Sequence, residues 1–230
     1  MFSVKFAMIY KIERGKYMDF ESYFNKLNKF YKHCYESSEE HLKFHLIAPL
    51  FIEEWEFEAQ FNQMYVLGEG YRHILVDLML GDEVWIETKR MKLEPDIHNA
   101  SHNPQKRIDD FKEEPYIKML IMTNGLRWII HMKHPEGSYT DRIEFTLNHE
   151  TDSEVNTLFP KIIDSINALK KHSYSTIYQE ILDLHEEMIS IDKFNQLLKN
   201  NHSDMIKTLV QQFGGTEDYY RKAFAEEIVN

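Results

Sequence analysis

The chain has 230 residues, a net charge of −11, and hydrophobic and aromatic fractions of 43% and 13%. This length and apolar content support one large domain, or one domain with a small appendage, and exclude a disordered chain. The acidic balance argues against broad nonspecific coating of nucleic acid, although a local DNA groove remains compatible with it. With a single cysteine, no signal-peptide pattern and no apolar run of about 18 residues, we expect a soluble cytoplasmic protein that does not engage a membrane.

The first part of the chain predicts a strand or hairpin followed by two helices. The alternating apolar residues lie within residues 1–17, and apolar residues then recur at helical spacing over 19–35. A second helix should begin at Ser37 or Ser38, because serine is a good N-cap residue, and should run to Leu50.

The middle of the chain predicts strands and one further helix. Strands are expected at 63–68, 116–123, 126–132 and 143–147, with a hairpin at 75–89, a loop at 94–104 and a helix at 105–113. Asn124-Gly125 is a strong hairpin signal, since both residues tolerate positive φ. Beyond residue 151 the apolar spacing is helical and predicts three or more helices.

These patterns predict a mixed α/β (α+β) fold. Residues 1–150 should form a mixed central sheet flanked by helices, and residues 151–230 a helical C-terminal extension. The apolar stripes of these last helices should pack on the core or on a second copy of the chain.

The hairpin from Asp77 to Lys89 is the most informative part of the chain, and its chemistry depends on the strand register. If a three-residue loop pairs Leu80 with Val84, then Asp77, Glu87 and Lys89 share one face of the sheet. The opposite face would consist of Val76, Leu78, Ile86 and Thr88. A two-residue turn would instead send the two carboxylates to opposite faces, because a one-residue slip inverts every side chain.

Facing carboxylates of Asp77 and Glu87 would suit a metal ion. Such a pair holds Mg²⁺ through hard oxygen ligands, and Mn²⁺ is an alternative. The neighbouring Lys89 would position or deprotonate a water molecule and offset phosphate charge, while the ion lowers the pKa of that water. This combination hydrolyses phosphodiesters. Glu-x-Lys alternation is also common on solvated strand faces, so a purely structural role is the competing interpretation.

Further motifs surround this triplet in a definite order. They are Ser38-Glu-Glu-His-Leu-Lys43, Leu46-Ile-Ala-Pro-Leu-Phe51, Val76-Asp77, Ile86-Glu-Thr-Lys-Arg90, Pro104-Gln105 and Met122-Thr-Asn-Gly-Leu-Arg-Trp128. In order and approximate spacing, residues 38–132 resemble the N-terminal nuclease domain of the R subunit of type I restriction enzymes. That domain is a branch of the PD-(D/E)XK nuclease superfamily.

The resemblance implies a restriction-endonuclease-like fold and a set of site residues. Asp77 and Glu87 would be the metal ligands and Lys89 the catalytic lysine, with Glu39 and Gln105 as further site residues. Glu39 has an alternative role at a helix dipole, and Gln105 an alternative structural role at a helix start. The family's ATP-driven motor is missing, because no GxxxxGK[ST] loop follows residue 150.

Three functions compete at this point. The first is a Mg²⁺-dependent DNA endonuclease or nuclease subunit of a restriction or defence system, with DNA and protein subunits or a second copy as partners. The second is a catalytically silent nuclease-fold protein that binds other proteins or counters defence systems, which the net charge favours. The third is a structural module that oligomerises through its C-terminal helices.

Overall fold

The computed structural model describes residues 20–33, 36–67, 72–96, 103–137, 139–147, 154–216 and 218–219. The helices are α1 (Phe20–His33), α2 (Glu39–Leu42), α3 (Ile52–Trp55), α4 (Pro104–Glu113), α5 (Glu154–Ala168) and α6 (Tyr174–Phe213). The strands are β1 (Ala59–Leu67), β2 (Arg72–Leu80), β3 (Val84–Thr88), β4 (Met119–Thr123), β5 (Arg127–Lys133) and β6 (Thr140–Thr146). The strand or hairpin predicted for residues 1–17 lies outside the described residues.

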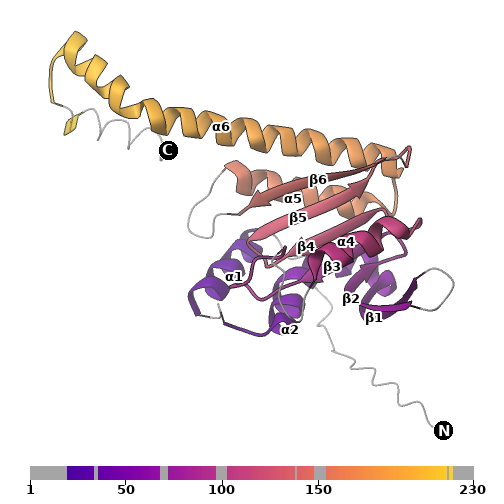
Figure 1. Ribbon diagram of the computed structural model, residues 1–230. Helices are drawn as coiled ribbons and strands as arrows, with labels where there is room; N and C mark the ends of the chain where they lie inside the picture. Colours follow the sequence, from indigo (N-terminus) through magenta and orange to yellow (C-terminus); the bar gives the residue numbers. More distant parts are fainter. Residues whose placement is uncertain are drawn as a thin grey trace, which may run out of the picture.

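The six strands form one mixed sheet in the order β1-β2-β3-β4-β5-β6 (Figure 1). Neighbouring strands are antiparallel except β3 and β4, which are parallel. A parallel pair needs a long crossover connection, and here the crossover contains α4. The predicted mixed α/β class with a central sheet is therefore confirmed.

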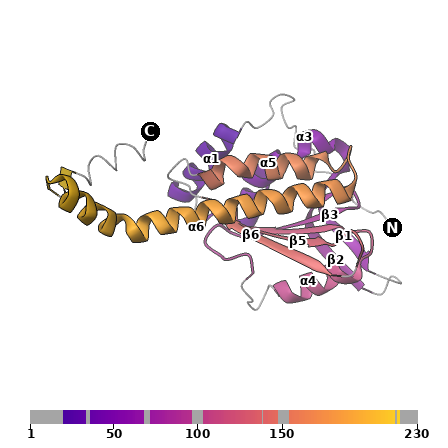
Figure 2. The same cartoon turned by 90° about the horizontal axis from the view of Figure 1, so that it is seen from above.

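Helices cover both faces of this sheet. Figure 2 shows α1, α5 and α6 on one face and α4 on the other. The larger hydrophobic cluster joins the first face to its helices and contains the fully buried Leu27, Phe159 and Ile181. The smaller cluster joins the second face to α4 through Phe111 and Trp85. α5 and the first half of α6 thus share one core with the sheet.

The amphipathic helix predicted for residues 19–35 is α1. Leu27 and Phe30 are buried, as the helical spacing predicts, and Tyr23 is buried beside them. The Tyr23 hydroxyl donates to the carbonyl of Gly125 at 3.0 Å. Gly125 has a φ of +88°, and a Cβ atom there would lie 2.9 Å from a methyl carbon of Leu46. Tyr23 thus fastens α1 to the β4–β5 loop, and Leu46, from the segment after α2, packs closely on the same loop.

The second predicted helix begins as expected but does not continue as one α-helix. Ser38 is the N-cap, and its hydroxyl accepts the N–H of His41 at 3.2 Å. After α2 the chain forms a π-helix at Lys43–Ile47 and a 3₁₀ turn at Ala48–Leu50. The 3₁₀ turn contains Pro49, which has no N–H to donate to a regular helical turn.

The hairpin predicted at Asn124-Gly125 is confirmed, but its loop is longer than a two-residue turn. Thr123 pairs with Trp128, so four residues separate the paired positions. Gly125 has positive φ, whereas Asn124 does not. Instead, Asn124 Oδ1 accepts the N–H groups of Leu126 and Arg127 at 3.0 and 2.8 Å. The side chain thus closes the loop as an Asx turn does.

Residues 174–213 form one helix of 40 residues, so the prediction of more than one helix within this stretch is wrong. The sequence of α6 contains no glycine or proline that would interrupt it, and Gly214, with a φ of +73°, ends it. The predicted stripe packs as expected in its first half, where Ile177, Ile181 and Met188 are buried. Figure 1 shows the second half of α6 extending past the sheet. Among the described helices, none combines the length and the apolar character that crossing a bilayer requires.

Candidate active site

The β2–β3 hairpin has the register that a three-residue loop predicts. Leu80 pairs with Val84, and Leu78 pairs with Ile86. The regular pairing ends there, so Val76 and Thr88, which the same register would place opposite each other, are not paired. Thr88 donates its N–H to Asp77 Oδ2 at 2.8 Å and its hydroxyl to the same oxygen at 3.1 Å. The Asp77 carboxylate thus takes the place of a backbone carbonyl as the acceptor for the Thr88 N–H, because β2 and β3 begin to separate beside Asp77.

The pairing between β1 and β2 is interrupted at the same level. Phe61 pairs with Leu78 and Gln63 pairs with Val76, while Asn62 lies between them with a φ of +50°. The extended conformation that alternates side chains between faces is broken there. On β2, opposite this position, Leu78 belongs to the larger hydrophobic cluster and Val76 to the smaller one. The prediction that these two residues share a face is wrong, and Asp77 lies where the faces exchange.

Asp77 is held from the helix side by Lys43. The Lys43 ammonium lies 3.2 Å from Asp77 Oδ1 and is fully buried, whereas the Asp77 side chain retains 13% exposure. The same ammonium donates to Asn62 Oδ1 at 2.6 Å and to Glu40 Oε1 at 2.7 Å. The Asp77 carboxylate therefore has an ordered donor at each oxygen.

Glu87 is the most buried carboxylate of the group, with 5% exposure. Arg107 Nη2 from α4 lies 2.9 Å from Glu87 Oε1, but the angles do not make a hydrogen bond. Among the described residues, Glu87 Oε1 therefore has no hydrogen-bond partner. Burial raises the pKa of Glu87 to about 8, with Arg107 opposing the rise and the charge of Asp77 adding to it.

Lys89 and Glu39 form an ion pair that completes the group. Lys89 Nζ donates to Glu39 Oε1 at 3.0 Å and to the carbonyl of Thr88 at 2.7 Å. Burial raises the pKa of Glu39, the positive charge of Lys89 lowers it, and Asp77 raises it again. Lys89 is only 8% exposed, so it does not lie on a solvated strand face. Its N–H donates to the carbonyl of Thr123, which keeps the chain beside β4 after β3 ends.

Gln105 is placed differently from the other predicted site residues. It lies on the exposed side of α4, where its amide donates to Asp109 at 2.8 Å. The same helix sends Arg107 toward Glu87, and Arg107 also donates to the carbonyl of Leu75. The structure thus brings Glu39, Asp77, Glu87 and Lys89 together, while Gln105 points to the outside of α4.

Comparison with protein-family models, with curated proteins and with solved structures gave no match. The geometry of the group is therefore the basis for assigning a function. Within the described ranges, no three His, Cys, Asp or Glu side chains gather as a ready-made metal site. An ion here would depend on Asp77 and Glu87, with water completing its shell. The buried Glu87 Oε1 without a hydrogen-bond partner fits that role, since an ion would satisfy it.

Sequence reasoning gave no role to three residues of the group: Lys43, Asn62 and Arg107. Lys43 interrupts an apolar helical stripe that includes Leu46 and Ile47, and a lysine in such a stripe is a usable signal for a buried charge. Asn62 and Arg107 carry no comparable signal in the sequence.

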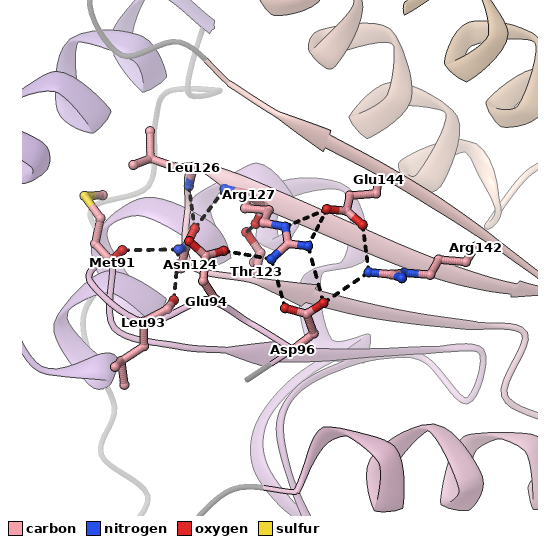
Figure 3. Close-up of polar contacts among 10 residues, drawn as sticks. All are labelled: Met91, Leu93, Glu94, Asp96, Thr123, Asn124, Leu126, Arg127, Arg142 and Glu144. Atoms are coloured by element: carbon pink, nitrogen blue, oxygen red, sulfur yellow. Dashed lines mark hydrogen bonds and ion pairs between the residues drawn. The ribbon is translucent and has the colours of Figure 1, made fainter. Parts of the chain in front are cut away.

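The segment after Lys89 is fixed to the β4–β5 loop by polar contacts (Figure 3). The Asn124 amide donates to the carbonyls of Met91 and Leu93 at 3.2 and 2.9 Å. Arg127 bridges Glu94 and Asp96, at 2.8 and 2.9 Å from its Nη1. These contacts prevent the chain that follows the Glu-x-Lys strand from moving away from the sheet.

Proposed function

We propose that this protein is a metal-dependent nuclease that hydrolyses phosphodiester bonds of DNA. The observation that carries the proposal is the convergence of Asp77, Glu87, Lys89 and Glu39 where β2 and β3 separate. Opposite charges and a buried carboxylate oxygen without a hydrogen-bond partner meet there, and a group of this kind is a candidate functional site.

The order of the elements supports a restriction-endonuclease-like site. Glu39 lies on a helix ahead of the sheet, Asp77 on β2, and Glu87 on β3 with Lys89 directly after it. The helix that opens with Pro104-Gln105 follows and leads back into the sheet. This is the order of motifs in the nuclease domain that the sequence resembles. In this proposal the second half of α6 is an extension that binds a protein partner, and the protein acts in the cytoplasm.

Asp77 and Glu87 would hold Mg²⁺, or Mn²⁺ in its place. A bound divalent ion stabilises negative charge on a phosphate and lowers the pKa of a bound water. The protein's own residues then have defined tasks. Lys89 directs its ammonium toward the phosphate, and Glu39 and the Thr88 carbonyl hold that ammonium in place. Arg107 favours the ionised form of Glu87, which an ion would require.

A second function has one specific observation in its favour. Lys43 and Arg107 already compensate Asp77 and Glu87 without any ion. A catalytically silent protein that keeps a nuclease fold and binds other proteins would have such an internally neutralised group, and the net charge of −11 suits a basic partner.

The test is cutting of supercoiled plasmid by purified protein with Mg²⁺ or Mn²⁺, with and without excess chelator. Wild type should cut only with the ion. Lys89→Met should not cut, whereas Lys106→Met, which alters an exposed lysine on α4, should cut like wild type. Cutting by Lys89→Met would show a contaminating nuclease or another site. No cutting and no calorimetric ion binding by wild type would favour the silent protein.

A further inference from the structure

Lys43 is a fully buried lysine whose ammonium has an acceptor for each of its three N–H bonds. The acceptors are Glu40 Oε1, Asn62 Oδ1 and Asp77 Oδ1, at 2.7, 2.6 and 3.2 Å. Lysine is almost never fully buried unless it is paired. Its exposure of 0% excludes contact with a substrate, so its role must act through the residues that it binds.

Two backbone irregularities meet at this ammonium. Lys43 is the first residue of the π-helix, a conformation that occurs frequently at functional sites. Asn62 has positive φ in the middle of β1, where a non-glycine residue is strained. Strain of this kind persists only where surrounding contacts over-determine it, and here Asn62 Oδ1 accepts from Lys43.

The three acceptors are all oxygen atoms of carboxylate or amide groups. Hard divalent cations such as Mg²⁺ and Mn²⁺ prefer this kind of ligand. A fully apolar group could occupy this position, since replacing a whole buried ion pair by apolar residues of similar volume is often neutral. Instead, the positively charged Lys43 ammonium lies among the oxygens of Glu40, Asn62 and Asp77.

We propose that the Lys43 ammonium is a built-in substitute for a second divalent ion, so that the site binds one metal ion rather than two. The inference rests on the proposed function, because it assigns the remaining ion to Asp77 and Glu87. Lys43 is a positioning residue: it fixes one oxygen of Asp77, and its charge repels a second cation from that oxygen.

The test counts bound Mn²⁺ from the electron paramagnetic resonance signal of the free ion. The number of ions bound by Asp77→Asn is subtracted as background. Asp77 would contribute an oxygen both to the ion at Glu87 and to an ion in place of the Lys43 ammonium, so this variant lacks a ligand of each. Wild type and Lys43→Arg should bind one ion. Lys43→Ala, which frees the three oxygens, should bind two. Lys43→Met, which fills the space with apolar atoms, should bind no more than one.

The outcomes separate this inference from the proposed function. If wild type and Lys43→Ala each bind one ion, the Lys43 ammonium does not replace a second ion, although the nuclease site remains supported. Two ions bound by wild type would lead to the same conclusion. If wild type binds no ion and Lys43→Ala binds one, the Lys43 ammonium does take the place of an ion, but the proposed metal site at Asp77 and Glu87 is wrong. No ion in either protein would overturn both.

Lys43→Ala has a second readout in case it folds poorly. Methylammonium carries the group that the variant lacks, so methylammonium or Mn²⁺ should restore folding, measured as a rise in Tm that Lys43→Met does not show. Failure of both cations to raise the Tm would overturn the inference.

Discussion

Asp77 accepts two hydrogen bonds from Thr88 and so serves as the strand partner that Thr88 lacks. The sheet would otherwise leave a buried N–H unpaired where β2 and β3 separate, which is costly. The carboxylate therefore has a structural task in addition to its proposed role as a metal ligand. A change at Asp77 should affect stability and activity together.

We expect Asp77→Ala to lower the free energy of unfolding by about 3 kcal/mol in the absence of metal. It leaves the buried Lys43 with one carboxylate fewer and removes the acceptor of the Thr88 N–H. Urea unfolding measures this change, and the exposed Asp109→Ala is the matched control. A gain in stability would instead show that repulsion between Asp77 and Glu87 outweighs these bonds.

Gly125→Ala should be clearly more destabilising than Gly137→Ala. Both glycines have positive φ, of 88° and 78°, so backbone strain costs each variant about 1 kcal/mol. Only at Gly125 does the new methyl group meet another atom, Leu46 Cδ2, at 2.9 Å, whereas Gly137 has open space. Overpacking adds a further cost of about 1–3 kcal/mol. Equal midpoints in denaturant would show that the Leu46 side chain moves aside without cost.

Asn124→Asp should destabilise the protein by about 2–3 kcal/mol near neutral pH. The new carboxylate would face the carbonyls of Met91 and Leu93, to which the amide now donates. Amide hydrogen exchange should also quicken in residues 91–96. Lowering the pH should reduce the difference from wild type, because a protonated carboxyl can donate to one carbonyl. A difference that is independent of pH would exclude this explanation.

His131 should make the protein less stable as the pH falls from 7 to 5. Burial is the main cause of a pKa lowered to about 4, to which the charges of Arg142 and Lys112 also contribute. The unfolded chain takes up a proton near pH 6.5 while the folded protein does not, so the free energy of unfolding falls with decreasing pH. His131 should account for about 2 kcal/mol of the loss between pH 7 and 5.

His131→Gln should remove that part of the pH dependence. The exposed His172→Gln should leave it as in wild type. Urea unfolding at several pH values measures both. Identical slopes for wild type and His131→Gln would contradict the assignment.

The sequence was sufficient to predict those parts of the fold that depend on repeated apolar patterns. The hairpin register follows from the alternation around Leu80 and Val84, because a slip would have exposed an entire apolar face. That register brings Asp77 and Glu87 into one group. α1 was equally predictable from its helical spacing.

The remaining errors have physical reasons. Alternation assumes that every second side chain of β2 lies on the same face, and the exchange of faces between Val76 and Leu78 has no pattern in the sequence. Gaps in an apolar stripe suggested separate helices, whereas α6 continues because no residue stops it. Gln105 shares a helix with Arg107, and a one-dimensional motif cannot tell which of the two faces the sheet.

The larger hydrophobic cluster extends along the chain from Tyr23 to Met188. The ribosome has synthesised every residue of the candidate site once Arg107 is made, yet about eighty further residues must follow before this cluster is complete. Until then the sheet lacks α5 and α6 on one face, and its apolar side chains stay in contact with water. A nascent chain therefore carries all the chemical groups of the site before it has the core that holds them in place, and that core is complete only when synthesis has reached Met188 in α6.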